Sequence, residues 1–270
     1  MSEFRLTQEQ VGCFDQDGFL FVENLFEGDE VDLVKQVTEL SDKVAKGVAD
    51  NLDAEGGISK IWLTMDLEDD VFGAFVRCGR IVNPLEQLLR DKVYHFHHKM
   101  MLKEPHVGGA WEWHQDYGYW YRDKLDALLF PDTASCMVAI TSATKENGCL
   151  QVIRGSHRMG RIEHGTIGTQ AGANLERVES ALEHLDLVHC EMEVGTALFF
   201  HGNLLHRSDQ NRSPHARWSF ISCYSAMHNV SCNDSDAHRK GRARFQKGAD
   251  ERIREIGEQQ VTELKAQAAG

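Results

Sequence analysis

The spacing of apolar and polar residues changes character near Asp91. Before this point, apolar side chains recur every three or four residues from Asp29 onward, at Leu33, Val37, Leu40 and Val44. Such spacing predicts a helix with one apolar stripe packed on a core. A second helical stretch is expected from Val71 to Leu89, after a polar, glycine-bearing loop from Asn51 to Gly57. The segment 1–90 is therefore expected to form a mainly helical buttress.

Shorter patterns lie at the two ends of the chain. Thr7 and Gln10 form a capping-box pattern, which predicts a short helix ending at Asp15. A strand is expected from Gly18 to Val22. Residues 249–268 are charged and alanine-rich with a loose apolar stripe, so a C-terminal helix is expected there, for packing or for contacts between copies of the chain.

After Asp91, short apolar and aromatic runs are separated by turn residues. The runs are Val93–Phe96, Cys136–Ile140, Leu150–Ile153, Thr196–Phe200 and Arg217–Tyr224. They predict a β-barrel or sandwich core over about residues 91–228, packed by the helices before it. An insertion with a helical pattern, residues 161–190, is too long for a hairpin turn and is expected to be a lid or rim element. We expect a single domain over residues 1–270.

The acidic balance of the chain narrows its possible partners. The formal net charge is -13 and the isoelectric point is near 5.5, which disfavours nucleic acid and anionic membrane surfaces. No apolar run approaches the roughly 20 residues of a membrane span, and no signal-peptide pattern is present. We therefore expect a cytoplasmic protein. The 7 cysteines are scattered without a CxxC pair and are expected to be reduced, mostly buried thiols.

The segment from Trp111 to Trp120 contains a His-x-Asp pair, His114 and Asp116. On an extended strand, residues two apart face the same side, so both side chains are expected to bind one metal ion. A third ligand is expected at His206, which follows a strand-like run. Two imidazoles and one carboxylate leave positions open for substrate and oxygen, as in non-haem iron oxygenases.

A cation and a hydroxyl follow the remote histidine. Arg217 opens the next strand-like run, and an antiparallel hairpin is expected to place it beside His206. Its planar guanidinium can pair two-pronged with a carboxylate, and Ser208 is expected to add a hydroxyl on the same face. A His-x-Asp pair alone arises easily by chance among 14 histidines and 42 acidic residues, whereas the ordered combination is far more specific.

Specific segments extend this pattern over most of the chain. They are Phe14–Phe19, Trp113–Asp116, Glu146–Leu150 continuing through Gly155–His157, and His206–Ser208 with Arg217. In these segments the chain resembles the phytanoyl-CoA dioxygenase family of iron(II)- and 2-oxoglutarate-dependent oxygenases. The resemblance implies a mainly β fold with flanking helices and a double-stranded β-helix core of jelly-roll type. It also implies Fe(II), 2-oxoglutarate and O2, with His114, Asp116 and His206 as catalytic metal ligands and with Arg217 and Ser208 holding 2-oxoglutarate.

Neighbouring residues are secondary candidates. Tyr119 and Trp120 are expected near the pocket mouth, where aromatic faces can bind a small cation or zwitterion. Lys60 and Lys103 are further charged contacts to consider. Asn147 is interpreted as a turn residue, and three other histidines are interpreted as structural or exposed: His157, His164 and His201.

The implied reaction is hydroxylation of an unactivated C–H bond with release of succinate and CO2. Related halogenases leave the carboxylate position empty for halide, whereas Asp116 fills it here, which favours hydroxylation. Because the acidic chain offers no basic surface for an acyl-CoA, we expect a small polar metabolite: an amino-acid derivative or an ectoine-like or aminophosphonate-like compound. Two alternatives stay open, a catalytically idle metal-binding jelly-roll protein and a metal-dependent hydrolase or isomerase on the same fold.

Overall fold

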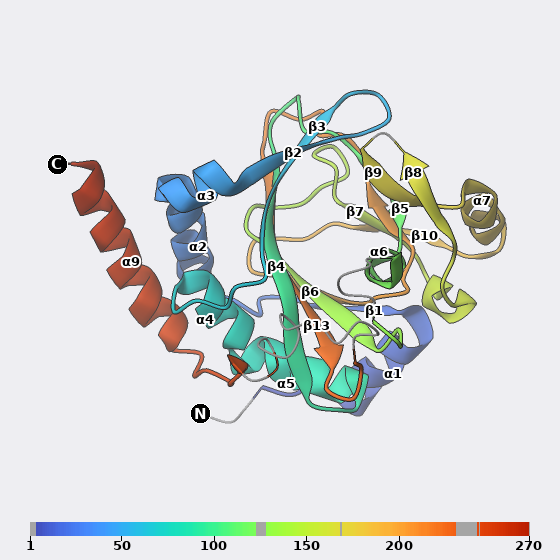
Figure 1. The fold of residues 1–270 in the computed structure, drawn as a ribbon, viewed down its shortest axis with the longest axis horizontal. Coiled ribbons are helices and arrows are strands. Elements are labelled where there is room, and N and C mark those ends of the chain that lie inside the picture. The colour runs from blue at the N-terminus through green and yellow to red at the C-terminus, as the bar shows by residue number, and fades with distance from the viewer. Residues whose placement is uncertain (1–3, 123–127, 168, 231–241, 243, 270) are drawn as a thin grey trace.

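The computed structural model describes residues 4–122, 128–167, 169–230, 242 and 244–269. Within these ranges the chain forms two antiparallel sheets, a separate two-stranded hairpin and a set of outer helices (Figure 1).

The larger sheet has seven strands in the order β1-β11-β6-β13-β4-β3-β2. Their bounds are β1 Phe19–Val22, β2 Val48–Leu52, β3 Ile58–Thr64, β4 Val93–Lys103, β6 Thr133–Ala139, β11 Ala197–His201 and β13 Arg217–Ala226. Every neighbouring pair is antiparallel. The longest pairing joins β13 to β4, with Arg217 opposite Lys103 at one end and Ala226 opposite Val93 at the other.

The smaller sheet has four strands in the order β10-β7-β12-β5. Their bounds are β5 Trp111–His114, β7 Leu150–Ile153, β10 Leu187–Cys190 and β12 His206–Ser208. The separate hairpin pairs β8, His164–Ile167, with β9, Gln170–Ala173. Because β12 lies next to β5, His206 comes directly opposite His114 although the two are far apart in the sequence.

The helices cover the outside of the two sheets. They are α1 Gln8–Asp17, α2 Gly28–Leu40, α3 Asp42–Gly47, α4 Val71–Arg77, α5 Gly79–Leu89, α6 Asp116–Arg122, α7 Leu175–His184 and α9 Arg252–Ala268, with a 3-10 turn η1 at Ser156–Met159. Figure 1 shows α2, α4 and α9 on one side of the larger sheet, whereas α7 lies at the opposite end of the molecule.

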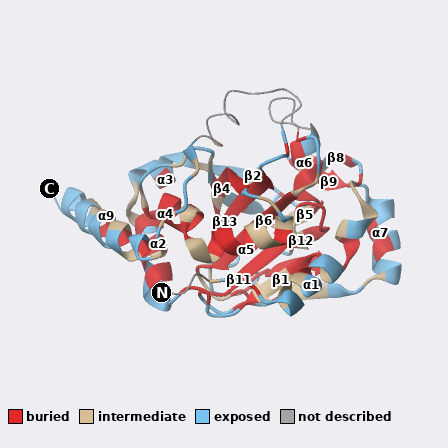
Figure 2. Ribbon diagram, turned by 90° about the horizontal axis from the view of Figure 1, so that it is seen from below, coloured by how far each residue is buried: buried red, intermediate tan, exposed pale blue. Residues whose placement is uncertain are grey.

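Alternation along the strands divides the apolar side chains between two cores. On the outer face of the larger sheet, Phe220 packs against Phe72 and Phe75 of α4. On the inner face, Met101 and Ile221 join the core between the two sheets. Figure 2 shows the buried residues concentrated in the central strands, while the far half of α9 is exposed. The predicted fold class, mainly β with flanking helices and a jelly-roll core, is confirmed.

The N-terminal segment is less helical than predicted. It supplies α1 to α5, but β1, β2 and β3 join the larger sheet. The loop predicted from Asn51 to Gly57 is in part the turn of a β2–β3 hairpin. The strand β2 escaped detection because it is an edge strand without a single buried residue, so its sequence carries no apolar alternation.

Other predicted boundaries were also wrong. The helix expected from Asp29 divides at Ser41, whose side chain caps α3, and the next helical stretch divides at Cys78. The strand predicted to end at Phe96 continues to Lys103, because its histidines are buried in spite of their polarity. The strand β10 belongs to the smaller sheet, so the insertion is shorter than residues 161–190.

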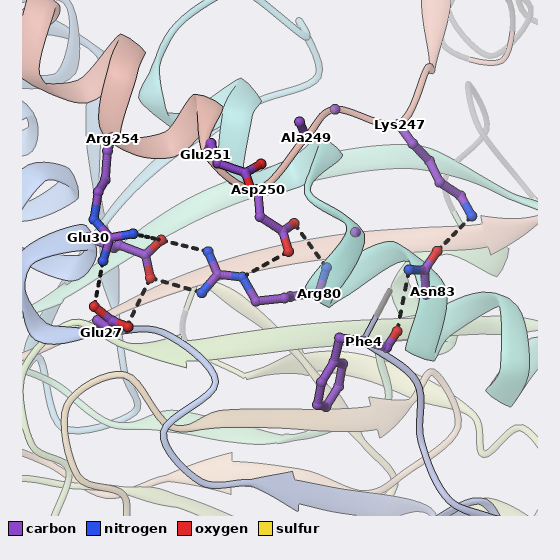
Figure 3. A pocket seen from close by; sticks show the side chains of 12 residues that line it. Phe4, Glu27, Glu30, Arg80, Asn83, Lys247, Ala249, Asp250, Glu251 and Arg254 are labelled. Atoms are coloured by element: carbon purple, nitrogen blue, oxygen red, sulfur yellow. Dashed lines mark hydrogen bonds and ion pairs between the residues drawn. The ribbon is translucent and has the colours of Figure 1, made fainter. Parts of the chain in front are cut away.

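The helix α9 is held in place by ion pairs around a buried carboxylate (Figure 3). The Glu30 side chain on α2 is 1% exposed and accepts from Arg80 of α5 at 2.9 and 2.6 Å. Arg254 of α9 approaches the same carboxylate at 3.3 Å, and Asp250 pairs with Arg80 at 3.2 Å. Burial acts to raise the pKa of Glu30, but the guanidinium of Arg80 holds that pKa below its ordinary value. The C-terminal segment is thereby tied to two helices of the N-terminal segment.

The remaining expectations on composition concern thiols and membranes. Across the described residues, all six cysteines are free thiols and five of them are buried, while Cys232 lies outside the described residues. In the same part of the chain, no helix has both the length and the apolar character needed to cross a bilayer.

Candidate metal and cosubstrate site

The three predicted metal ligands converge between the two sheets. His114 ends β5, Asp116 opens α6 and His206 begins β12. Both Nε2 atoms lie 3.8 Å from Asp116 Oδ1, and the two imidazole centroids are 4.0 Å apart. One ligand atom from each residue lies within 4.8 Å of the others. The three donors therefore face a common point at separations that suit a single metal ion.

The local backbone around Asp116 differs from the prediction. His114 and Asp116 do not share an extended strand, because β5 ends at His114 and a helix begins two residues later. The turn between them is fixed by the fully buried Gln115, whose amide nitrogen donates to the carbonyls of Gly160 and Asn203 at 2.8 and 2.7 Å. Asp116 thus reaches the common point from the first turn of a helix.

The two imidazoles present their unprotonated nitrogen to this point. Nδ1 of His114 donates to the Glu112 carbonyl at 2.7 Å, and Nδ1 of His206 donates to the Leu204 carbonyl at 2.9 Å. Because a carbonyl can only accept, each neutral ring carries its proton on Nδ1 and keeps the Nε2 lone pair free. Burial lowers the pKa of both histidines, which favours the neutral form that metal binding requires.

A serine from the larger sheet orients the carboxylate. Ser135 on β6 donates to Asp116 Oδ2 at 2.9 Å, which leaves Oδ1 facing the two histidines. Burial acts to raise the pKa of Asp116, but the positive charge of Lys99, followed by His206 and the hydrogen bond from Ser135, brings that pKa below its ordinary value. The carboxylate is therefore ionised and available as a ligand.

These residues open onto a cavity between the sheets. Side chains of both sheets line it: Lys99, Met101, Trp111, His114, Asp116, Met137, Leu150, Phe200, His206, Arg207, Ser208, Arg217 and Ile221. The metal ligands and the predicted cosubstrate residues thus share one cavity.

Arg217 reaches this cavity by a different route from the one predicted. It does not pair with His206 in a hairpin, because β12 belongs to the smaller sheet and β13 to the larger one. The chain crosses between the sheets over residues 209–216, so the two side chains meet across the cavity. Arg217 is 2% exposed, and burial lowers its pKa to about 10.

The guanidinium of Arg217 is held by two acceptors. Nε and Nη2 donate to the Gly148 carbonyl at 3.2 and 2.8 Å, and Nη1 donates to Ser219 Oγ at 3.2 Å. A guanidinium has five N–H donors, so one on Nη1 and one on Nη2 stay available. These two form the fork that suits a carboxylate.

The turn that carries Gly148 explains the Asn-Gly pattern in the sequence. Asn147 accepts from the Thr144 backbone at 2.7 Å and donates to the Ser142 carbonyl at 2.9 Å, so its role is to hold the turn. Gly148 has a φ of +78°, and a Cβ there would lie 2.3 Å from the Asp209 carbonyl oxygen. Only glycine lets this turn present its carbonyl to Arg217.

Of the two secondary lysines, one lies at the site and one does not. Lys103, 1% exposed, donates from Nζ to Ser208 Oγ at 2.9 Å and also to the Asp209 carbonyl. Burial, and after it the charge of Arg217, holds the pKa of Lys103 well below its ordinary value. Lys60 is exposed and lies opposite Leu102 of β4. It is on the outer face of the larger sheet, where Trp62 and Met100 enter the outer core, and not on the face that lines the cavity.

The aromatic residues beside the metal ligands do not line the cavity as expected. The Tyr119 ring stands edge-on to His114 at 5.1 Å, while its hydroxyl donates to the Ala171 carbonyl at 2.7 Å. Trp120 is buried against Phe96 in the core between the sheets. Among the described residues, the aromatic side chains that line the cavity are Trp111 and Phe200, and neither was predicted as a site residue from the sequence.

The other histidines are tied to the protein. His164 accepts from the Gln115 backbone at 2.9 Å, and its second nitrogen bonds the Ile162 carbonyl. His201 accepts from the Asn203 backbone at 2.9 Å, and His157 faces the Asp15 carbonyl at 3.2 Å. These contacts agree with the prediction that the three histidines are structural or exposed.

Two cavity residues of β4 were not predicted from the sequence, Lys99 and Met101. The available signal was period-two alternation, because Lys99, Met101 and Lys103 share one face of a strand. That signal was hidden by the assumption that the strand ends at Phe96.

A wider cleft lies near α9 but shows a different chemistry. It is lined by residues that include Glu30, Arg80, Asn83 and Lys247 (Figure 3). Lys247 donates to Asn83 at 2.8 Å, and the Glu30 and Arg80 charges are paired with one another. These side chains are joined by structural ion pairs and hydrogen bonds, so the cleft is not a second candidate site.

Comparison with known proteins agrees with the donor set. The sequence model of the family described as phytanoyl-CoA dioxygenase matches residues 14–219, which include all three metal donors and Arg217. The chain belongs to the phytanoyl-CoA dioxygenase family. Membership in this family, together with the donor geometry, identifies an iron(II)- and 2-oxoglutarate-dependent dioxygenase that uses O2. The predicted family, enzyme class and cofactors are confirmed.

Two relatives illustrate the similarity. L-proline trans-4-hydroxylase from Streptomyces griseoviridis is 30% identical over 177 residues, which cover 60% of this chain and 65% of the relative. The match therefore spans less than two thirds of that relative. Ectoine dioxygenase from Bordetella bronchiseptica is 27% identical over 242 residues, covering 83% of this chain and 77% of the relative.

A solved structure shows the same fold. EctD from S. alaskensis with bound Fe superposes with a TM-score of 0.74 at 22% identity, covering 92% of this chain and 90% of that one. A second EctD structure, with 2-oxoglutarate and 5-hydroxyectoine, has a TM-score of 0.71 at 24% identity, with coverages of 87% and 82%. The jelly-roll core is thus shared with the solved members of this fold.

Proposed function

We propose that this dioxygenase hydroxylates an unactivated C–H bond of a small polar metabolite. The metal would be held by Nε2 of His114, Oδ1 of Asp116 and Nε2 of His206, the atoms that face a common point. The distal carboxylate of 2-oxoglutarate would be held by Arg217 and Ser208. The observation that carries this proposal is the convergence of all five side chains on one cavity.

In this reaction one molecule of O2 oxidises both 2-oxoglutarate and the substrate. 2-Oxoglutarate, O2 and a substrate C–H bond become succinate, CO2 and an alcohol, with one oxygen atom in succinate and the other in the new hydroxyl. The bound iron supplies the O2 activation that couples the two halves. The residues of the chain bind, orient and enclose the reactants.

The cosubstrate end of the cavity offers complementary donors. Arg217 has two parallel N–H groups left for a carboxylate after its bonds to Gly148 and Ser219. The Ser208 hydroxyl accepts from Lys103, so its own proton is free to donate to the same carboxylate. Because Arg217 is held by the rigid Gly148 turn, its fork is oriented before 2-oxoglutarate arrives.

The occupied carboxylate position favours hydroxylation over halogenation. A halide would need the coordination position that Asp116 fills, and Ser135 keeps that carboxylate turned toward the histidines. The cavity between the sheets is narrow, which favours a small metabolite over a bulky one. The relatives named for L-proline and ectoine act on compounds of this size, and the net charge of -13 disfavours an acyl-CoA.

The test supplies purified protein with Fe(II), 2-oxoglutarate and a panel of amino acids, cyclic amino acids, ectoine and aminophosphonates. We expect succinate release that depends on one compound, and a product heavier by one oxygen atom taken from 18O2. Metal binding without succinate from any compound would instead support an idle metal-binding protein. Turnover that survives Arg217→Ala and needs no 2-oxoglutarate would support a hydrolase or isomerase.

A further inference from the structure

The strand β4 places a lysine beside the metal ligands that the proposed chemistry leaves unused. Lys99 lines the same cavity as His114, Asp116 and His206. Its charge is the strongest of the influences that lower the pKa of Asp116, and it also acts on His206. Among the residues that the structure describes, no carboxylate lies within ion-pair distance of Lys99.

The position of Lys99 separates it from the cosubstrate anchor. Lys103 pairs with Arg217 at one end of the cavity, whereas Lys99 pairs with Ile221. Four residues of strand separate the two levels, a distance of about 13 Å along the backbone. Two residues beyond Ile221, Cys223 contacts Ser135, the serine that orients Asp116. Lys99 therefore belongs to the metal end of the cavity.

A count of charges leaves this lysine without a counter-ion. Iron(II) contributes two positive charges and Arg217 one, while Asp116 contributes one negative charge and 2-oxoglutarate two, so these groups cancel. Lys99, which is partly exposed, then adds an unmatched positive charge to the cavity, and counting Lys103 as charged would increase the excess. Because Lys99 is partly removed from water, an anion bound beside it would gain more from its charge than at an open surface.

We propose that Lys99 binds a compact anionic group, a carboxylate or a phosphonate, on the metabolite that is hydroxylated. The inference rests on the proposed function and refines its substrate class. The ammonium would anchor the anionic end of the substrate and thereby fix which carbon lies next to the metal.

The test uses matched pairs of compounds that differ in one charge. The pairs are each standard amino acid and its amide, ectoine and its carboxamide, and 2-aminoethylphosphonate and its diethyl ester. Each is supplied to the Fe(II) and 2-oxoglutarate-loaded protein, and succinate release and calorimetric binding without O2 are measured. We expect stimulation and binding by at least one acid and by none of the neutral partners. The carboxylate and phosphonate pairs then decide between the two anions.

Variants assign the preference to the lysine. Lys99→Met removes the charge at nearly constant length and is expected to weaken binding of the acid about 10- to 100-fold, the range for a lost charge-assisted hydrogen bond. Lys99→Arg is expected to restore part of the affinity. Lys60→Met, on the neighbouring strand but on its other face, is the matched control and is expected to change nothing.

The outcomes separate this inference from the proposed function. The visible charge-transfer band of the Fe(II)–2-oxoglutarate complex is recorded for wild type and Lys99→Met, and we expect equal 2-oxoglutarate affinity within about twofold. A loss of 2-oxoglutarate affinity in Lys99→Met would assign the lysine to the cosubstrate and overturn the inference. The inference is also overturned if the band is intact but the wild-type protein prefers the neutral compounds or binds none of the acids. Absence of the band in wild type would overturn the proposed function itself.

Discussion

At the scale of single residues, the metal site depends on side chains that never face the metal. Asp116 can bind through Oδ1 because Ser135 occupies Oδ2, and each histidine presents Nε2 because a backbone carbonyl holds Nδ1. The carbonyl acceptors belong to the chain itself and survive any side-chain substitution. The serine is the part of this arrangement that mutation can remove.

Ser135→Ala is therefore expected to weaken Fe(II) binding about 10- to 100-fold, the usual effect of losing a hydrogen bond that orients a ligand. Anaerobic Fe(II) titration of the folded variant measures this. Cys223→Ala is the control, because Cys223 contacts the Ser135 hydroxyl at 3.2 Å but not the carboxylate. Equal Fe(II) affinity in wild type and Ser135→Ala would show that Asp116 needs no such orientation.

A substitution at Gly148 tests whether its carbonyl holds the Arg217 side chain in place. In Gly148→Ala, the new Cβ would lie 2.3 Å from the Asp209 carbonyl oxygen at a φ of +78°. We expect the free energy of unfolding to fall by about 1–3 kcal/mol and 2-oxoglutarate binding to weaken, because the carbonyl that holds Arg217 moves. Chemical unfolding and the charge-transfer titration measure the two effects. Gly12→Ala in α1 is the control: a Cβ there would meet nothing within 4 Å, so this variant should be as stable as wild type. An unchanged 2-oxoglutarate affinity in Gly148→Ala would contradict the role of the Gly148 turn in holding Arg217.

At the scale of elements, α9 depends on the buried ion pair between Glu30 and Arg80. Arg80→Met leaves a carboxylate of 1% exposure with only the more distant Arg254 as an ion-pair partner among the described residues, so we expect the free energy of unfolding to fall by about 3–5 kcal/mol. The double variant Arg80→Met/Glu30→Leu should recover much of this loss, because no charge stays buried. Lys46→Ala, which breaks an ion pair of side chains 78% and 86% exposed, should leave the free energy of unfolding nearly unchanged. Urea unfolding that finds equal losses for Arg80→Met and Lys46→Ala would be incompatible with this account.

The elements also show how far the sequence could predict the fold. Helical stripes and the apolar runs of β6, β7, β11 and β13 could be predicted because their burial follows a regular period. The strand β2 could not, since nothing in it is buried, and the full length of β4 was missed because buried histidines and lysines look like surface residues.

The site shows the same division. Three metal donors and Arg217 could be found because their chemistry and order are specific, whereas Trp111 and Lys99 carry no motif. Sequence order also predicted a hairpin between His206 and Arg217, but the two strands lie in different sheets. Pairing between sheets is decided by the packing of the whole chain and not by the length of a loop.

At the scale of the whole molecule, buried histidines couple stability to pH. Several are buried with lowered pKa values: His95, His97, His98, His114, His201 and His206. Burial brings the pKa of His95 to about 3 and that of His201 to about 4. In the unfolded chain each would have a pKa near 6.5, so on acidification the unfolded state takes up protons first.

We therefore expect the metal-free protein to lose stability as pH falls below about 6.5, and to gain nothing from these groups above it. Each such histidine contributes about 1.4 kcal/mol per pH unit in this window. Urea unfolding at a series of pH values measures the slope, and His95→Gln should reduce it by about one such increment. Stability that is flat down to pH 5 would mean that these histidines are protonated in the folded protein.

The central claim is that one cavity binds Fe(II) through His114, Asp116 and His206 and binds 2-oxoglutarate through Arg217. Its most direct test is anaerobic titration of Fe(II) and 2-oxoglutarate into the purified metal-free protein, watching for the weak visible metal-to-ligand charge-transfer band. We predict that the band forms in wild type, disappears in His206→Ala, and needs far more 2-oxoglutarate in Arg217→Ala. A folded wild-type protein that forms no band, or variants that form it as wild type does, would contradict the claim.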